Sequence, residues 1–74
     1  MTMRVTINGK QEETGAATMA DLLSEKGIEP RMVTLEQNGQ IVAKDQIVST
    51  AIREGDKIEI LFFMGGGWTP TFPI

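Results

Sequence analysis

Hydrophobic and polar residues alternate along the first segment of the chain. Apolar residues occupy every second position there: Met3, Val5 and Ile7. This spacing predicts a strand with one buried face. The Asn8-Gly9 pair that follows is typical of a two-residue hairpin turn, because both central residues of a type I′ turn need positive φ. We therefore expect residues 10–14 to return as a second, more polar strand at an edge of the sheet.

The hydrophobic period then changes from that of a strand to that of a helix. Apolar residues fall three and four positions apart, at Met19, Leu22 and Leu23, which places them in one stripe. Thr18 is a suitable N-cap residue, and Asp21 adds a negative charge in the first turn, where it favours the helix dipole. Gly27 is placed to end the helix. The pattern predicts a helix over 19–26 with its apolar stripe in the core.

Two shorter strands are predicted around a second Asn-Gly pair. The segment that begins at Arg31 has Val33 and Leu35 on one face, and Asn38-Gly39 marks a tight turn before a short strand at Ile41-Val42. The next segment, 44–52, fits either a helical turn or an irregular crossing; its apolar residues are Ile47, Val48 and Ile52.

The last strand is predicted over residues 57–63. One face, expected to be buried, contains Ile58, Ile60 and Phe62, whereas Glu59, Leu61 and Phe63 lie on the other. A hairpin, a helix and returning strands bury their apolar faces when the helix packs on one side of a mixed sheet. We therefore expect an α+β fold with a mixed four- to five-stranded sheet on one helix, in which the first and last strands are neighbours. Residues 1–64 form the domain and 65–74 a flexible tail.

The composition excludes several classes of function. The chain has 74 residues, a formal net charge of −3, no cysteine and no histidine. Thiolate metal sites and cysteine nucleophiles are excluded, and the usual general base near neutral pH is missing. Scattered basic residues in an acidic chain argue against nucleic-acid binding. We expect no enzyme activity, metal or cofactor, no membrane span and, in the absence of a signal-peptide pattern, a cytoplasmic location.

Three consecutive glycines, Gly65, Gly66 and Gly67, follow the last strand. A phosphate-binding loop is excluded, because such loops precede a helix and supply a lysine, whereas Pro70 and Pro73 interrupt the residues that follow here. A plain flexible linker is the simplest interpretation of the glycines taken alone.

The whole chain nevertheless resembles the sulfur carriers of the ThiS/MoaD family, which have the ubiquitin-like β-grasp fold. The resemblance covers residues 3–67, and the segments that carry it are INGK, MADLLSEKGI, VTLEQNGQIVAKDQ and REGDKIEILFFMGGG. The last segment is the most specific, since it joins an acidic-glycine turn, a final strand and a glycine terminus.

The resemblance implies a carrier that is a co-substrate and not a catalyst. An ATP-dependent, ubiquitin-activating-like adenylyltransferase of the ThiF type adenylates the carboxylate of the terminal glycine. Sulfur from a persulfide then displaces AMP and leaves a thiocarboxylate, from which a thiazole synthase takes the sulfur in thiamine biosynthesis. Related carriers serve cysteine, homocysteine or molybdopterin synthesis. A ubiquitin-like protein modifier and a plain interaction module, never activated, are competing hypotheses.

Residues 68–74 depart from the pattern of the family, whose chains typically stop at the glycines. The carboxylate of Gly67 is held in the peptide bond to Trp68, so the resemblance implies removal of this extension by a JAMM-type metalloprotease. Gly67 is the expected end and Gly66 the second choice; a permanent tail in an inactive member is the competing hypothesis. We expect the tail to be unstructured instead of folded over the sheet.

Leu61, Phe63 and Met64 are the candidate partner-binding residues. They directly precede the glycines, and Leu61 and Phe63 lie on the face of the last strand that the helix does not cover. Exposed apolar patches on small proteins often mark interaction sites, although single exposed hydrophobic residues are common and need no function.

Overall fold

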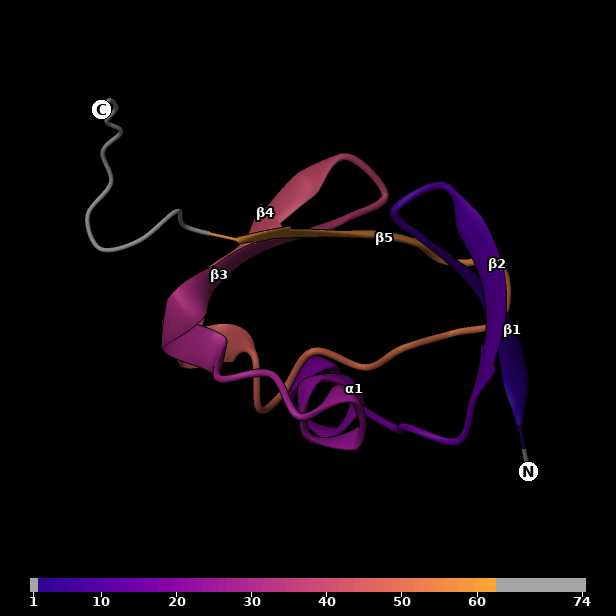
Figure 1. The fold of residues 1–74 in the computed structure, drawn as a ribbon, viewed down its shortest axis with the longest axis horizontal. Helices are drawn as coiled ribbons and strands as arrows, with labels where there is room; N and C mark the ends of the chain where they lie inside the picture. The colour runs from indigo at the N-terminus through magenta and orange to yellow at the C-terminus, as the bar shows by residue number, and fades with distance from the viewer. Residues whose placement is uncertain (1, 63–74) are drawn as a thin grey trace, which may run out of the picture.

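The structure is a computed structural model and describes residues 2–62. In this part of the chain a five-stranded sheet has the order β2-β1-β5-β3-β4. The strands are β1 (Met3–Ile7), β2 (Lys10–Thr14), β3 (Val33–Gln37), β4 (Gln40–Val42) and β5 (Lys57–Phe62). Helix α1 (Met19–Lys26) and two short 3₁₀ helices, η1 (Pro30–Met32) and η2 (Lys44–Gln46), complete the elements. The sheet curves around α1, which lies on its concave side (Figure 1).

The helix has the predicted bounds because its capping signals are local. The Thr18 side chain accepts a hydrogen bond from the backbone N–H of Asp21 at 3.2 Å, which satisfies one of the free donors of the first turn. Gly27 adopts the left-handed conformation, with φ of 71°, and its N–H donates back to the last turn. The predicted apolar stripe of α1 is buried: Met19, Leu22 and Leu23.

One hydrophobic core lies between α1 and the sheet. It is built from the helix stripe and from alternate residues of the three central strands: Val5, Ile7, Val33, Leu35, Ile58 and Ile60. Ile47 and Ile52 close the core from the connection that leads to β5. Burying a side chain of this size contributes about 1.5–3 kcal/mol, so these contacts dominate the stability of a chain this short.

Strand β5 is the centre of the sheet, and its position confirms that the first and last strands are neighbours. It pairs in parallel with β1, where Thr6 lies opposite Lys57 and Ile7 opposite Ile58. On its other side it pairs with β3 in antiparallel fashion from Ile58 to Phe62. The last described strand is thus the central strand of the sheet.

Both Asn-Gly pairs form the predicted hairpin turns, with positive φ at each position: Asn8 51°, Gly9 82°, Asn38 53° and Gly39 86°. Each asparagine also bonds to β5. The N–H of Lys57 donates to Oδ1 of Asn38 at 2.9 Å, and the N–H of Ile60 donates to Oδ1 of Asn8 at 2.7 Å. The turns therefore hold the strand that lies between the two hairpins.

Asp56 is a buried carboxylate that ties the start of β5 to its neighbours. Its side chain accepts hydrogen bonds from Nε2 of Gln37 at 2.9 Å, Nδ2 of Asn38 at 3.0 Å and the N–H of Arg53 at 2.8 Å. Burial raises the pKa of Asp56, but the bonds from Asn38, Arg53 and Gln37, with the charge of Arg53, outweigh it, so that the pKa is lower than its ordinary value.

Two expectations change at the ends of elements, and residues 44–52 combine the two conformations that the sequence left open. Arg31 and Met32 belong to η1, not to the strand, because Pro30 begins a 3₁₀ turn and β3 starts at Val33. Residues 44–52 contain η2 and then an irregular crossing. Phe62 is 55% exposed, although it faces the same side as Ile60, because it lies at the rim of the sheet as the last residue of the strand.

Replacing Asp56 with Asn should lower the free energy of unfolding by about 1–3 kcal/mol at neutral pH, because an amide cannot accept all three hydrogen bonds. The lowered pKa sets the acid dependence. The stabilisation is complete above the unfolded-state pKa of 3.8 and is lost as the pH falls through the lower folded-state value. Urea unfolding at neutral pH and at acid pH measures both effects. Equal stabilities of the variant and the parent chain at neutral pH would contradict the assigned role.

Candidate functional site

Strand β5 ends three residues before the first of the three glycines, and it is the last part of this segment that the structure describes. Phe63, Met64 and Gly65–Gly67 lie outside the described residues, as do residues 68–74. The expected partner contacts of Phe63 and Met64 and the tail therefore stay predictions. Ile60, Leu61 and Phe62 are the described residues nearest to the candidate reacting end.

The outer face of the sheet, away from α1, exposes two large apolar side chains. Leu61 is 47% exposed and lies opposite Thr34 on β3, so its expected exposure is confirmed. Ile41 on β4 is 71% exposed and lies opposite Glu36. Ile41 was not among the predicted partner residues. The signal was present, because a two-residue turn at Asn38-Gly39 pairs Ile41 with the outward-facing Glu36.

Two carboxylates face each other between these apolar side chains. Glu36 and Glu59 are directly opposite across β3 and β5. No ion pair among the described residues involves either of them. Like charges at this separation destabilise a sheet slightly, whereas Arg4 and Glu13 on the same face form an ion pair at 3.6 Å. The outer face near the end of β5 is therefore apolar with a negative centre.

A cleft lies on the helix side of the same strand end. It has a volume of about 290 Å³, and Ile7, Ile28, Ile60 and Phe62 provide its apolar lining. Its rim includes Lys10 and an ion pair of 2.7 Å between Lys26 and Glu12. Phe62, although 55% exposed, thus belongs to this cleft on the helix side of the sheet.

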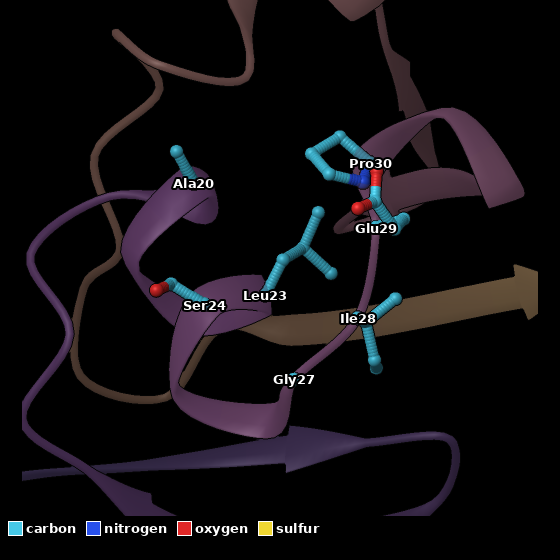
Figure 2. A pocket seen from close by; sticks show the side chains of 7 residues that line it. All are labelled: Ala20, Leu23, Ser24, Gly27, Ile28, Glu29 and Pro30. Atoms are coloured by element: carbon cyan, nitrogen blue, oxygen red, sulfur yellow. The ribbon is translucent and has the colours of Figure 1, made fainter.

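A second hollow, of about 370 Å³, lies beside α1. Figure 2 shows Leu23 pointing from the helix toward the segment that contains Ile28 and Pro30. Its single ionisable side chain, Glu29, forms an exposed ion pair with Arg31 at 3.6 Å. The lining also contains the hydroxyl of Ser24, which points away from Glu29 in Figure 2. The two groups do not form a catalytic pair, so this hollow is not a candidate active site.

The described residues provide no catalytic or metal-binding constellation. No cluster of acidic residues within 2–62 has the arrangement of a metal site, and the chain has neither cysteine nor histidine. Glu12 and Glu13 are in ion pairs with Lys26 and Arg4. Within the described part, no helix has the length and apolar character to cross a bilayer.

The model of the ThiS family matches residues 4–67. The chain belongs to the ThiS family. A sulfur carrier protein ThiS from Bacillus subtilis is 35% identical over 65 residues, which cover 82% of this chain and 96% of that protein. The crystal structure of the thiamine biosynthesis protein ThiS from Geobacter metallireducens gives a TM-score of 0.76 at 36% identity, over 88% of this chain and 100% of that one. The ThiS-like resemblance and the ubiquitin-like β-grasp fold are thus confirmed.

Part of a much longer protein also resembles this ThiS-family chain. A thiazole synthase from Paramagnetospirillum magneticum is 41% identical over 66 residues, which cover 88% of this chain. The chain spans about a fifth of the length of the thiazole synthases that it matches, 20% and 21% for two of them. The Bacillus subtilis relative is named a sulfur carrier protein, and the protein from Geobacter metallireducens is named a thiamine biosynthesis protein.

Leu61 should contribute little to folding. Replacing it with Thr, which suits a half-exposed strand position, should change the free energy of unfolding by less than about 1 kcal/mol. The fully buried Leu22 provides the comparison, because its replacement with Ala should cost about 2–5 kcal/mol. Urea unfolding of both variants measures the difference. A loss at Leu61 as large as that at Leu22 would mean that Leu61 belongs to the core.

Proposed function

We propose that this chain is a sulfur carrier for thiazole formation in thiamine biosynthesis. After residues 68–74 are removed, the carboxylate of Gly67 is adenylated and then converted to a thiocarboxylate that donates its sulfur. The main support is the extent of the ThiS family match, which begins at residue 4 and ends at residue 67, the third glycine. The β-grasp fold with the terminal strand at its centre agrees with this role.

A glycine end suits a substrate that enters another protein's active site. Without a Cβ atom, the backbone fits a narrow channel that would exclude other residues. The carboxylate attacks the α-phosphate of ATP and releases pyrophosphate. A persulfide then displaces AMP from the acyl adenylate and forms an acyl disulfide, and a thiol cleaves the S–S bond of this disulfide and leaves the thiocarboxylate. The partner supplies the catalytic groups, so a carrier without cysteine or histidine has all that the reaction requires of it.

The extension blocks this chemistry until it is removed. In the full-length chain the carbonyl carbon of Gly67 is joined to the nitrogen of Trp68 by an amide bond. Gly67 therefore has no carboxylate that could be adenylated. Hydrolysis of this bond by a JAMM-type metalloprotease produces the carboxylate. The end of the family match at residue 67 favours Gly67 over Gly66 as the new terminus.

The outer face near the end of β5 is the proposed docking surface. Leu61 with Phe63 and Met64 contacts the ThiF-like adenylyltransferase, and the exposed Ile41 on the same face extends the apolar area. The thiazole synthase takes the sulfur from the thiocarboxylate. The resemblance of this chain to part of two proteins named thiazole synthase supports that pairing over other sulfur acceptors.

The chain that ends at Gly67 should form an adenylate with ATP and a ThiF-like enzyme from the same genome. When a persulfide donor and a thiol reductant are added, the mass of the chain should rise by the difference between one sulfur and one oxygen atom, as measured by intact-protein mass spectrometry. The full-length chain is the control and should remain unchanged. Conjugates to other proteins without a thiocarboxylate would favour the ubiquitin-like modifier, and an inert trimmed chain would favour the plain interaction module.

Replacing both Leu61 and Phe63 with Asp should raise the KM of the ThiF-like enzyme for the chain that ends at Gly67 at least about tenfold. The physical reason is that two charges would face an apolar partner surface. The fold should persist, as circular dichroism and thermal melting can show. Val48 is the matched control: it is 72% exposed in the connection before β5, and Val48→Asp should leave KM unchanged. An unchanged KM in the double variant would remove this docking surface from the proposal.

A further inference from the structure

The ladder between β1 and β5 is much shorter than β5 itself. Its paired residues are Thr6 with Lys57 and Ile7 with Ile58. The chain then turns away at Asn8-Gly9, whereas β3 accompanies β5 on the other side as far as Phe62. Among the described residues, the second half of β5 therefore has a strand neighbour on one side and lacks one on the β1 side.

The side chain of Asn8 fills the first position of this gap. Its Oδ1 accepts a hydrogen bond from the N–H of Ile60 at 2.7 Å, and its Nδ2 donates to the carbonyl of Ile60 at 3.2 Å. The backbone N–H of Asn8 also donates to the carbonyl of Ile58 at 2.9 Å. A primary amide offers one acceptor and donors in the same plane, as a peptide group does. Asn8 thus extends the ladder by one residue without an additional strand.

The turn itself does not require this side chain. Asn8 has φ of 51°, a conformation that glycine adopts with less strain than any other residue. The Asn38 turn shows what the same residue does at the other end of β5: with φ of 53°, its Oδ1 accepts from the N–H of Lys57 and its Nδ2 donates to Asp56. The two asparagines have equal turn geometry but hold opposite ends of one strand.

We propose that Asn8 is a positioning residue for the reacting end of the carrier, an inference that rests on the proposed function. Its amide fixes the backbone of Ile60, the residue before the docking side chain of Leu61 and two positions before Phe62. With this bond pair the end of β5 is ordered before the partner arrives. Without it, the partner must hold the strand end in place while binding, and only the ordered fraction of the carrier is ready to bind.

The test compares Asn8→Gly with Asn38→Gly, the same substitution in the same type of turn. In the full-length chain, amide hydrogen exchange at Ile60 should become at least about tenfold faster in Asn8→Gly, since its N–H loses its acceptor. In Asn38→Gly it should match the parent. Both variants should melt at a lower temperature than the parent chain.

The kinetics of adenylation distinguish a positioning role of Asn8 from a general effect on stability. They are measured on the chain that ends at Gly67, which retains every described residue. Asn8→Gly should raise KM about fivefold or more and leave kcat unchanged, because the docked complex holds the strand end by itself. Asn38→Gly should keep the parent KM despite its lower melting temperature. Asn8→Asp retains an acceptor for the N–H of Ile60 but has no donor for its carbonyl, so its exchange rate and KM should be intermediate.

The outcomes distinguish the two proposals. If the parent chain is adenylated and Asn8→Gly keeps the parent KM, the positioning role of Asn8 is wrong and the proposed function stands. If Asn38→Gly raises KM as much as Asn8→Gly, the effect is one of general stability and the inference is overturned. A parent chain that is never adenylated refutes the proposed function, and the positioning role with it.

Discussion

The hydrogen bonding of β5 is the constraint on which the rest of this structure depends. The strand is the last in sequence but the third across the sheet, so β1 and β3 must both be in place before it can pair fully. Its residues Ile58 and Ile60 are both buried in the core. The helix covers them from one side, and both hairpin turns contribute an asparagine amide to the backbone of the strand. Under the proposed function, the segment that a partner must find in a fixed place thereby follows a strand that is held from both sides.

Local signals made the helix and the hairpins predictable. Thr18, the apolar stripe and Gly27 act within one or two turns of chain, and the helix ends at Lys26 as expected. The Asn-Gly pairs likewise specify their own turns. The expectations that were wrong concern features that depend on neighbouring segments and not on the local sequence. Phe62 has the alternation of a buried residue, yet it is exposed because it lies at the rim of the sheet. Arg31 was expected in a strand, but the 3₁₀ turn that begins at Pro30 contains it, and the strand begins at Val33.

The candidate site was predictable only in part, for a related reason. The exposure of Leu61 follows from alternation along a single strand, and Ile41 would have followed from pairing across the Asn38-Gly39 turn. The contact between Asn8 and Ile60 joins residues 52 positions apart, and no pattern in the sequence shows that a turn residue has this second bond. The proposed role of the three glycines rests on the family resemblance, because the glycines taken alone favour a plain flexible linker.

The two ends of β5 are held by unequal sets of polar contacts, and the inequality suits a carrier. At Lys57 the asparagine amide is backed by the buried Asp56, which also binds Gln37 and the N–H of Arg53. At Ile60, within residues 2–62, the β1 side has only the amide of Asn8. Because a network with several partners opens less readily than a single bonded pair, opening of the domain should begin at the glycine end of the strand. Loss of the Asn8 bonds should therefore disorder the strand end near Leu61, while the buried start of β5 keeps the core closed.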